Sequence, residues 1–381
     1  MTLLLPQGTT VPVCLRPLDV LFFRDGRPFG AATRASTDLP QPQTLAGAIS
    51  TALLQKYACD FDALATRVRS GQSPRDAIRA ACGEAWIADV QVRGPWLAWR
   101  GADGKGSLDV LLPMPAILHA AKDTKDEAAD QLYPLHPFPR GATLPGWTPP
   151  EAGVRPLWLR AAKTTEAARG YLGRAGLEAF LAGKPVLQQH VVDAEQLFAR
   201  DHRTGIGIQP DRLTSEEGQI YMASFLALNP AAEVCLYAEV QVPGGHADAL
   251  DGISMIPFGG EGRRVAVERQ DSRFSWPQVT PDEQHKPLLL LTSPGLFDEP
   301  NWRPACLNGR LVSAAVPGAV AVSGWDLARG GPKPTRFAAA AGSVYFLDTL
   351  PTSLPDTLAD REDDRRQGWG CYLQGVWTDD Q

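Results

Sequence analysis

The chain has 381 residues, of which 44% are hydrophobic, and a formal net charge of −6. This length and apolar content are enough for a buried core and favour two domains over one. A charged fraction of 21%, with aromatic residues along the whole length, excludes a wholly disordered chain. The acidic balance argues against a broad basic surface for nucleic acid, so any nucleic-acid contact must be local.

Glycine and proline are abundant, with 36 and 33 residues. This excess over a typical globular composition predicts many turns, short strands and long connections in an α+β or β-rich body. The basic residues comprise 29 arginines and only 8 lysines. The planar guanidinium of arginine binds phosphate through two hydrogen bonds and stacks on aromatic rings better than the ammonium of lysine does. GC-rich coding would produce the same excess of arginine over lysine.

The six cysteines are scattered without a CxxC pair or a His/Cys cluster, so the sequence indicates neither a zinc site nor a disulfide framework. The N-terminal MTLLLPQGTT has no charged leader, and no apolar run approaches the ~18 residues of a membrane span. We therefore expect a cytoplasmic protein with no metal, no cofactor and no membrane contact.

The first half is expected to open with a strand, a long loop and a helix. Residues 11–23 are rich in β-branched and aromatic side chains and predict a strand, which ends at the turn RDGRPFG. After a proline-bearing loop, apolar residues at helical spacing predict a helix over 44–58, with Thr44 as its N-cap. Further expected elements are strands near 86–93 and 108–112, a proline-rich insertion over 120–160 and a helix at 176–183.

The next segment carries the glycine motifs. Residues 201–229 are predicted to be a polar, glycine-bearing loop that runs into a strand. The alternating residues 233–242 predict a strand, HADALDGI (246–253) predicts a short helix, and a strand over 265–269 follows the glycine cluster.

From Lys286 onward the strand pattern restarts. Strands are predicted at PLLLLTSPGLF, RLVSAAVPGAVAVSGW and RFAAAAGSVYFLD. A solvated helix is predicted at TLADREDDRRQ, and the chain closes with GWGCYLQGVW. Both halves thus end with a strand, a short helix, a glycine loop and a final strand. This order indicates a weak internal repeat, with a boundary near residues 275–286.

The glycine cluster IPFGGEGRR, residues 256–264, is the first candidate site. It lacks the Gly-Lys-Ser/Thr of a Walker loop, and it fails the dinucleotide fingerprint because a helix precedes it and a strand follows. One interpretation is a tight turn that needs positive φ. The other is a loop whose exposed N–H groups hold a phosphodiester, with Arg263 and Arg264 adding charge.

Two other segments concentrate polar chemistry. In RDGRPFG, Arg24 and Arg27 flank an Asp-Gly turn and Phe29 could stack on a base, although a salt bridge of Asp25 with either arginine would also explain the turn. In HRTGIG, His202 is the one histidine placed in a polar glycine-bearing loop. No GxSxG or HExxH motif is present.

Taken together, five segments resemble the RAMP proteins of type III-B CRISPR effectors. They are LRPLDVLFFRDGRPF, HRTGIGIQPDRLTSEEGQIY, IPFGGEGRR, GWDLARGGPKPTRFAAAAGSVYFLD and GWGCYLQG. The resemblance is to the third subunit of the Cmr complex and spans about residues 15–375. It implies an α+β fold of two tandem ferredoxin-like (RRM-related) domains, each with a glycine-rich loop before its last strand. The domains would be 1–275, with insertions over 120–200, and 276–381.

The resemblance also implies a function without catalysis. Such proteins hold the 5′ handle of the mature CRISPR RNA (crRNA) and join the large polymerase-type subunit to the first backbone RAMP subunit. Carried onto this sequence, the family's RNA-binding positions are Gly259, Gly260, Gly262, Arg263, Arg24, Arg27, Phe29, His202, Arg203, Thr204, Lys333 and Arg336.

Two alternatives remain open at this point. Relatives of this fold cut precursor CRISPR RNA without metal, which needs a base for the 2′-OH and an acid for the leaving oxygen. His202 with Tyr221 or Lys286 is the only available guess for such a pair. The chain could also be a protein-only scaffold, with the RNA held entirely by neighbouring subunits.

Overall fold

The structure is a computed structural model of the chain and describes residues 8–23, 34–35, 39–122, 131–142, 144–159, 161, 163–208, 211–212, 215–326 and 329–379. For 34–35, 205–208 and 215–221 the backbone alone is described. Its secondary structure is mixed, with antiparallel sheets and six α-helices in these residues. The helices are α1 (Pro42–Lys56), α2 (Phe61–Arg69), α3 (Pro74–Ala81), α4 (Arg174–Leu181), α5 (Ala194–Leu197) and α6 (Glu362–Arg366).

The larger sheet has eight antiparallel strands in the order β11-β10-β4-β3-β14-β1-β16-β15. The helix α1 covers one face, with Leu45, Ile49 and Leu53 fully buried because they recur on one side of the helix. The strands are β1 (Gly8–Pro17), β3 (Gln91–Trp99), β4 (Asp109–Pro113), β10 (Tyr171–Leu172), β11 (Val191–Val192), β14 (Cys235–Pro243), β15 (Met255–Pro257) and β16 (Arg264–Arg269).

The smaller sheet has four antiparallel strands from the C-terminal part, in the order β18-β23-β17-β24. They are β17 (Lys286–Leu291), β18 (Leu311–Ala315), β23 (Val344–Leu347) and β24 (Tyr372–Trp377). Short pairs of strands accompany it, namely β19 (Ala319–Val322) with β22 (Arg336–Ala339) and β20 (Trp325–Asp326) with β21 (Gly331–Pro332).

The two sheets repeat one strand order. In the larger sheet, four of the strands lie side by side in the order β3-β14-β1-β16. In the smaller sheet the order is β18-β23-β17-β24. If each set is numbered along the chain, both sheets have the order 2-3-1-4. The helix α1 crosses between the first and second strands of the first set, whereas α6 lies between the third and fourth strands of the second set. A glycine-bearing turn precedes the fourth strand in each.

A shared hydrophobic core joins the sheets. Trp96 of β3 and Leu172 of β10 belong to the same buried cluster as Leu288 of β17 and Phe346 of β23. The indole N–H of Trp96 donates to the backbone oxygen of Thr292 at 3.0 Å. Burial of this interface therefore fixes the position of one sheet relative to the other.

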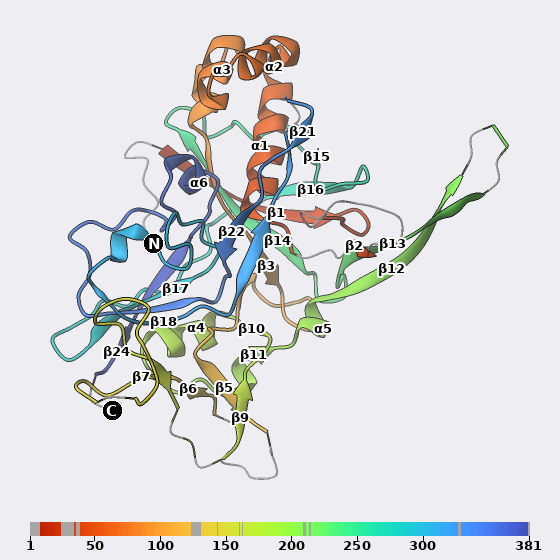
Figure 1. The fold of residues 1–381 in the computed structure, drawn as a ribbon. Helices are drawn as coiled ribbons and strands as arrows, with labels where there is room; N and C mark the ends of the chain where they lie inside the picture. The colour runs from red at the N-terminus through yellow and green to blue at the C-terminus, as the bar shows by residue number, and fades with distance from the viewer. Residues whose placement is uncertain are drawn as a thin grey trace.

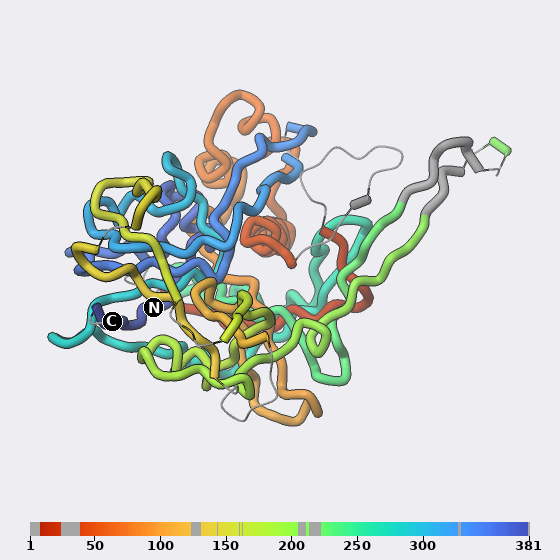
Figure 2. The backbone as a smooth tube through the Cα atoms, turned by 60° about the horizontal axis from the view of Figure 1, so that its bottom comes forward, coloured from red at the N-terminus to blue at the C-terminus, as the bar shows by residue number. Residues whose placement is uncertain are grey.

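A long hairpin leaves this body at one side (Figures 1 and 2). It consists of β12 (Phe198–Ile208) and β13 (Ser215–Leu228), and β2 (Arg34–Ala35) pairs with β13 in parallel. The predicted loop at HRTGIG was therefore wrong, because residues 201–208 form a strand. Its glycines and polar residues resemble a loop locally, but the pairing with β13 satisfies its backbone groups.

Other local predictions also need correction. Residues 246–253 form consecutive turns instead of a helix, which Gly252 at φ +78° favours. The first helix starts at Pro42 with Gln41 as N-cap, because proline suits the first helical position better than Thr44 suits the cap. Residues 85–89 form a 3-10 helix before β3, and α2 and α3 were not anticipated.

The proline-rich insertion is built of short strands: β5 (Leu118–Ala121), β6 (Tyr133–Pro134), β7 (His136–Pro137), β8 (Leu157–Trp158) and β9 (Thr165–Ala167). Part of it is attached to the smaller sheet. The Arg155 N–H donates to Val312 O at 2.8 Å, and Ser313 Oγ donates to Arg155 O at 2.8 Å. The insertion therefore bridges the two sequence halves.

No helix among the described residues is long and apolar enough to cross a membrane. In the same residues, no group of three or more His, Cys, Asp and Glu side chains is arranged to hold a metal ion.

Candidate nucleic-acid interface

The glycine cluster forms the tight turn between β15 and β16. The Phe258 N–H donates to Arg263 O at 2.8 Å, and the Arg263 N–H donates to Gly260 O at 3.2 Å. Gly259, Glu261 and Gly262 have φ of +86°, +55° and +65°. The turn therefore needs residues that tolerate positive φ, as one of the two interpretations of the sequence requires.

Two of these glycines also let the turn lie directly on Phe22 and Phe23. A Cβ on Gly259 would lie 2.4 Å from Phe22 O, and one on Gly260 would lie 3.1 Å from the Phe22 ring. The Gly260 N–H donates to Phe22 O at 2.8 Å. That N–H is already occupied, and within the described chain the N–H groups of Glu261 and Gly262 have no backbone acceptor.

An arginine–aromatic cluster adjoins the turn. The guanidinium carbons of Arg203 on β12 and Arg263 in the turn each lie 4.9 Å from the ring centre of Phe225 on β13. Phe22 also contacts this ring, with the centroids 5.1 Å apart. The structure thus brings together the predicted residues Arg203 and Arg263, through a phenylalanine that sequence analysis did not single out.

Among the described residues, each arginine of the cluster has one carboxylate partner. Arg263 Nη1 lies 2.6 Å from Asp19, and Arg203 Nη2 lies 2.7 Å from Asp201. The Val20 backbone N–H, with Arg263 and Arg203 nearby, holds the pKa of Asp19 below its ordinary value. The cluster is therefore neutral at physiological pH, and a bound phosphate must use the remaining N–H groups or compete with these carboxylates.

The other predicted residues of the hairpin lie beside this cluster along β12. His202 and Thr204 are exposed, and His202 pairs across the ladder with Ser224. Because side chains alternate along a strand, His202 and Thr204 lie on the face opposite to Arg203. The predicted residues Arg24, Arg27 and Phe29 lie outside the described residues, directly after Phe23 in the chain.

The predicted residues of the C-terminal half do not belong to this cluster. Lys333 is exposed beside β21, and its N–H donates to Gly324 O at 2.7 Å. Arg336 on β22 donates two hydrogen bonds, at 2.8 and 2.7 Å, to Asp364 of α6. This bidentate ion pair holds the helix on the strand and engages both Nη groups, so the geometry gives Arg336 a structural role.

The second glycine turn, before β24, is also structural. Gly368 and Gly370 are buried, and the Gly370 N–H donates to Pro294 O at 2.8 Å. A Cβ on Gly368 would lie 2.8 Å from Val92 O of β3. This turn thus packs between the two sheets, unlike its counterpart at Gly259.

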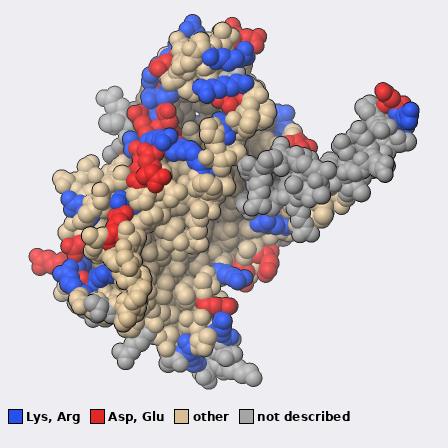
Figure 3. Space-filling model, viewed as in Figure 1, with Lys and Arg blue, Asp and Glu red and all other residues tan. Residues whose placement is uncertain are grey.

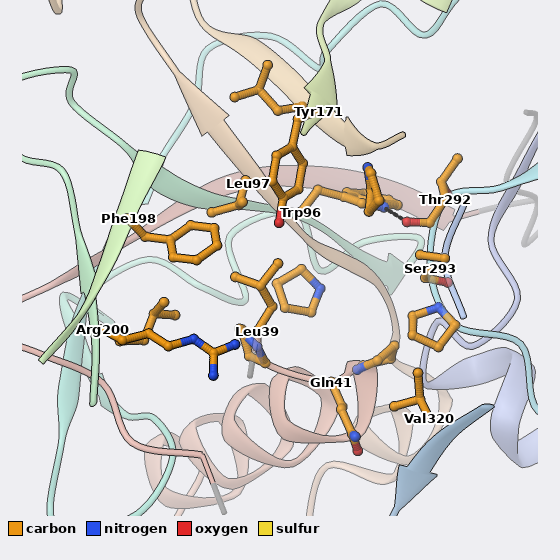
Figure 4. Close-up of a pocket in the computed structure, with 18 residues that line it drawn as sticks. Leu39, Gln41, Trp96, Leu97, Tyr171, Phe198, Arg200, Thr292, Ser293 and Val320 are labelled. Atoms are coloured by element: carbon orange, nitrogen blue, oxygen red, sulfur yellow. Dashed lines mark hydrogen bonds between the residues drawn. The ribbon is translucent and has the colours of Figure 1, made fainter. Parts of the chain in front are cut away.

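A cleft of about 320 Å³ opens at the junction of the two sheets, beside the root of the hairpin. Figure 4 shows Tyr171, Arg200 and Gln41 placed around it with Phe198 and Trp96. Burial raises the pKa of Tyr171 to about 12, so its hydroxyl stays protonated at physiological pH. The lining therefore combines aromatic walls with polar groups that hydrogen-bond, a composition suited to one nucleobase.

The charge distribution agrees with a local contact. On the face shown in Figure 3, basic and acidic residues intermix around α2, α3 and α6, and the middle of the face is mostly uncharged. Salt bridges account for part of this mixture, since Arg75 contacts both Asp89 and Glu362. The described residues on this face therefore form no broad basic surface.

The alternative catalytic pair gains no support from Lys286. Although burial alone would lower the pKa of Lys286, hydrogen bonds from its ammonium to Asp348 and Asp379, at 2.7 and 2.8 Å, raise it. A raised pKa makes the ammonium a poorer proton donor near neutral pH. The side chain of Tyr221, the other suggested partner of His202, lies outside the described residues.

Comparison with known protein families gives a match that spans nearly the whole chain. The family model described as CRISPR-associated protein (Cas_Cmr3) matches residues 13–377. No curated protein matches the sequence.

Among solved structures, a chain of the type III-B Cmr-beta complex bound to cognate target RNA and AMPPnP is 18% identical. The alignment covers 88% of this chain and 86% of that one, with a TM-score of 0.49. A chain of the same complex bound to cognate target RNA is 17% identical, with the same coverage and TM-score. A chain of the type III-A Csm3-Csm4 subcomplex is 11% identical, with 95% and 98% covered and a TM-score of 0.43.

The contact of the glycine turn with Phe22 predicts unequal effects of two substitutions. Gly259→Ala and Gly262→Ala both place a side chain at positive φ, which costs about 1–2 kcal/mol. Only Gly259→Ala also meets a backbone oxygen, whereas Gly262 has open space. We expect urea denaturation to show a loss of unfolding free energy about 1–3 kcal/mol larger for Gly259→Ala. Equal losses for the two variants would contradict the contact.

Proposed function

The chain belongs to the Cas_Cmr3 family of CRISPR-associated proteins, and from this membership we propose that it is a non-catalytic subunit of a type III-B (Cmr) RNA-guided interference complex. In this role it clamps the 5′ handle of the crRNA. One observation carries the placement of the RNA: three segments distant in sequence converge on Phe22 and Phe225. These are the end of the first strand region, the hairpin and the glycine turn.

The fold assignment follows the same line. The shared strand order of the two sheets is that of a split β-α-β unit, which supports two tandem ferredoxin-like domains. The first retains the helix of its first crossover and the second retains a short helix at its second crossover. The glycine turn before β16 faces the RNA, whereas the turn before β24 joins the domains.

The clamp combines three kinds of contact. The N–H groups of Glu261 and Gly262 bind phosphate oxygens, and Arg203 and Arg263 exchange part of their carboxylate contacts for the RNA backbone. Exposed residues of β12, including His202 and Thr204, contact the strand along the hairpin. These contacts position the RNA but carry no sequence information.

Sequence is read in the cleft. A handle base enters between the two sheets, stacks on an aromatic wall and hydrogen-bonds to Tyr171 or Gln41. The cleft and the clamp share the hairpin, because Leu226 lines the cleft and Phe225 carries the arginines. Because side chains alternate along a strand, Leu226 and Phe225 lie on opposite faces of the hairpin, so one bound strand occupies both sites by passing around the edge of the hairpin.

The partners follow from the family resemblance. The subunit joins the large polymerase-type CRISPR subunit to the first backbone RAMP subunit, and the crRNA handle is shared at that junction. The net charge of −6 suits this role, because an RNA contact confined to one clamp leaves the remaining surface to protein neighbours and solvent.

The clamp predicts a selective loss of RNA affinity. We expect Arg203→Ala with Arg263→Ala to weaken binding of handle-bearing crRNA about tenfold, measured by fluorescence anisotropy. If two phosphate contacts are lost, the slope of log affinity against log salt falls by about 1.4.

The matched control is Arg329→Ala with Arg361→Ala. These arginines also contact one aspartate each, Asp326 and Asp298, but lie in the C-terminal half. An equal loss of affinity in both double variants would show that general charge, and not the clamp, holds the RNA.

The non-catalytic assignment has its own test. The purified chain, incubated with repeat RNA in EDTA, is expected to leave the RNA intact, and His202→Ala is expected to change nothing in this assay. Metal-independent cleavage that disappears in His202→Ala would replace this proposal with the endoribonuclease alternative.

A further inference from the structure

A second polar pocket lies at the opposite end of the molecule from the hairpin. Its volume is about 410 Å³, and the proline-rich insertion forms one wall while the loops flanking β18 and β23 form the other. Figures 1 and 2 both place the insertion (yellow) and the hairpin at opposite sides of the body. Its charged lining residues are Arg140, Glu151, Arg155, Arg310 and Asp348.

The fixed part of this pocket is Arg155. Its Nη1 donates to Phe138 O at 2.9 Å and its Nη2 to Asp379 at 2.6 Å. Lys286 bridges the same Asp379 to Asp348, at 2.8 and 2.7 Å. These two cations and two carboxylates neutralise one another, so they form a rigid and locally uncharged floor.

Two further arginines of the pocket, Arg140 and Arg310, are not neutralised by this group of charges. Within the described chain Arg310 contacts no carboxylate, and its Nη1 is oriented by Thr349 Oγ1 at 2.8 Å and Leu350 O at 3.2 Å. Arg140 has 73% of its side chain exposed, and it reaches Asp348 and Asp379 only at 3.5 and 3.9 Å. Glu151 is taken by Arg303 at 2.6 Å. The pocket thus carries an excess of positive charge, on guanidinium groups with N–H donors to spare.

We propose that this pocket docks an acidic segment of a neighbouring protein, with an Asp or Glu carboxylate held between Arg140 and Arg310. A guanidinium binds a carboxylate through two parallel hydrogen bonds, and a partly enclosed site strengthens them. The occupant is a protein because the lining contains no aromatic side chain on which the bases of single-stranded RNA would stack. The distance from the hairpin also separates the pocket from the proposed RNA clamp.

In this proposal the proline-rich insertion has a function, because it completes the docking pocket. It carries Arg140 and bonds to β18 through Arg155 and Val312, so it is held rigidly where it completes the pocket. An acidic segment bound there would attach a partner to the smaller sheet without touching the cleft. This inference does not depend on where the RNA binds.

The test compares two labelled probes on the full-length chain. Fluorescein-labelled hexaglutamate and a labelled oligouridine of similar charge are titrated against the wild-type chain and Arg140→Gln with Arg310→Gln. We expect hexaglutamate to bind about tenfold more weakly to the double variant, with oligouridine binding unchanged. If the double variant unfolds, Arg140→Gln alone, which removes one charge at an exposed position, is expected to give part of the loss.

The matched control is again a pair of exposed arginines elsewhere, Arg329→Gln with Arg361→Gln, which is expected to leave hexaglutamate binding unchanged. Equal losses in both double variants, or no loss in either, would overturn the docking site. A loss confined to oligouridine would also overturn it and identify a phosphate site instead. Failure of the RNA clamp would appear only in the Arg203 and Arg263 variants.

Discussion

The hydrophobic core shared by the two sheets is the constraint on which the other features depend. Trp96 and Phe346 come from different sheets and different halves of the sequence, yet they are buried in one cluster. Because neither sheet buries its inner face without the other, the cleft at their junction has a fixed shape. The second glycine turn serves the same joint, since Gly368 allows the close approach to Val92.

The proposed RNA clamp depends on this joint indirectly. The hairpin starts at the mouth of the cleft, and its residues Phe198 and Arg200 line the cleft. Further along the hairpin, Phe225 contacts both Arg203 and Arg263 next to the glycine turn. Glycine at position 259 matters less for exposing backbone N–H groups than for letting the turn lie on Phe22. A loop chosen for close packing also holds its remaining N–H groups in place, which favours binding a fixed phosphate.

The local pattern of apolar residues was sufficient to predict those elements whose structure is determined by their own segment of sequence. The strand at 233–242 and the helix at 176–183 were predicted close to their observed bounds, because the spacing of their apolar residues is local information. HRTGIG was mistaken for a loop because its pairing with β13 is non-local information. Phe225 could not be selected for the same reason, as it is one of 13 phenylalanines and only the strand register brings it to Arg203.

The central claim is that the crRNA handle lies across the hairpin root and the glycine turn. The most direct measurement is photo-crosslinking of 4-thiouridine placed in the handle, within the assembled complex, followed by mass spectrometry of the crosslinked peptides. The account predicts crosslinks to peptides that contain residues 198–204 or 258–263. Handle crosslinks confined to other subunits, or to peptides around α6, would contradict it.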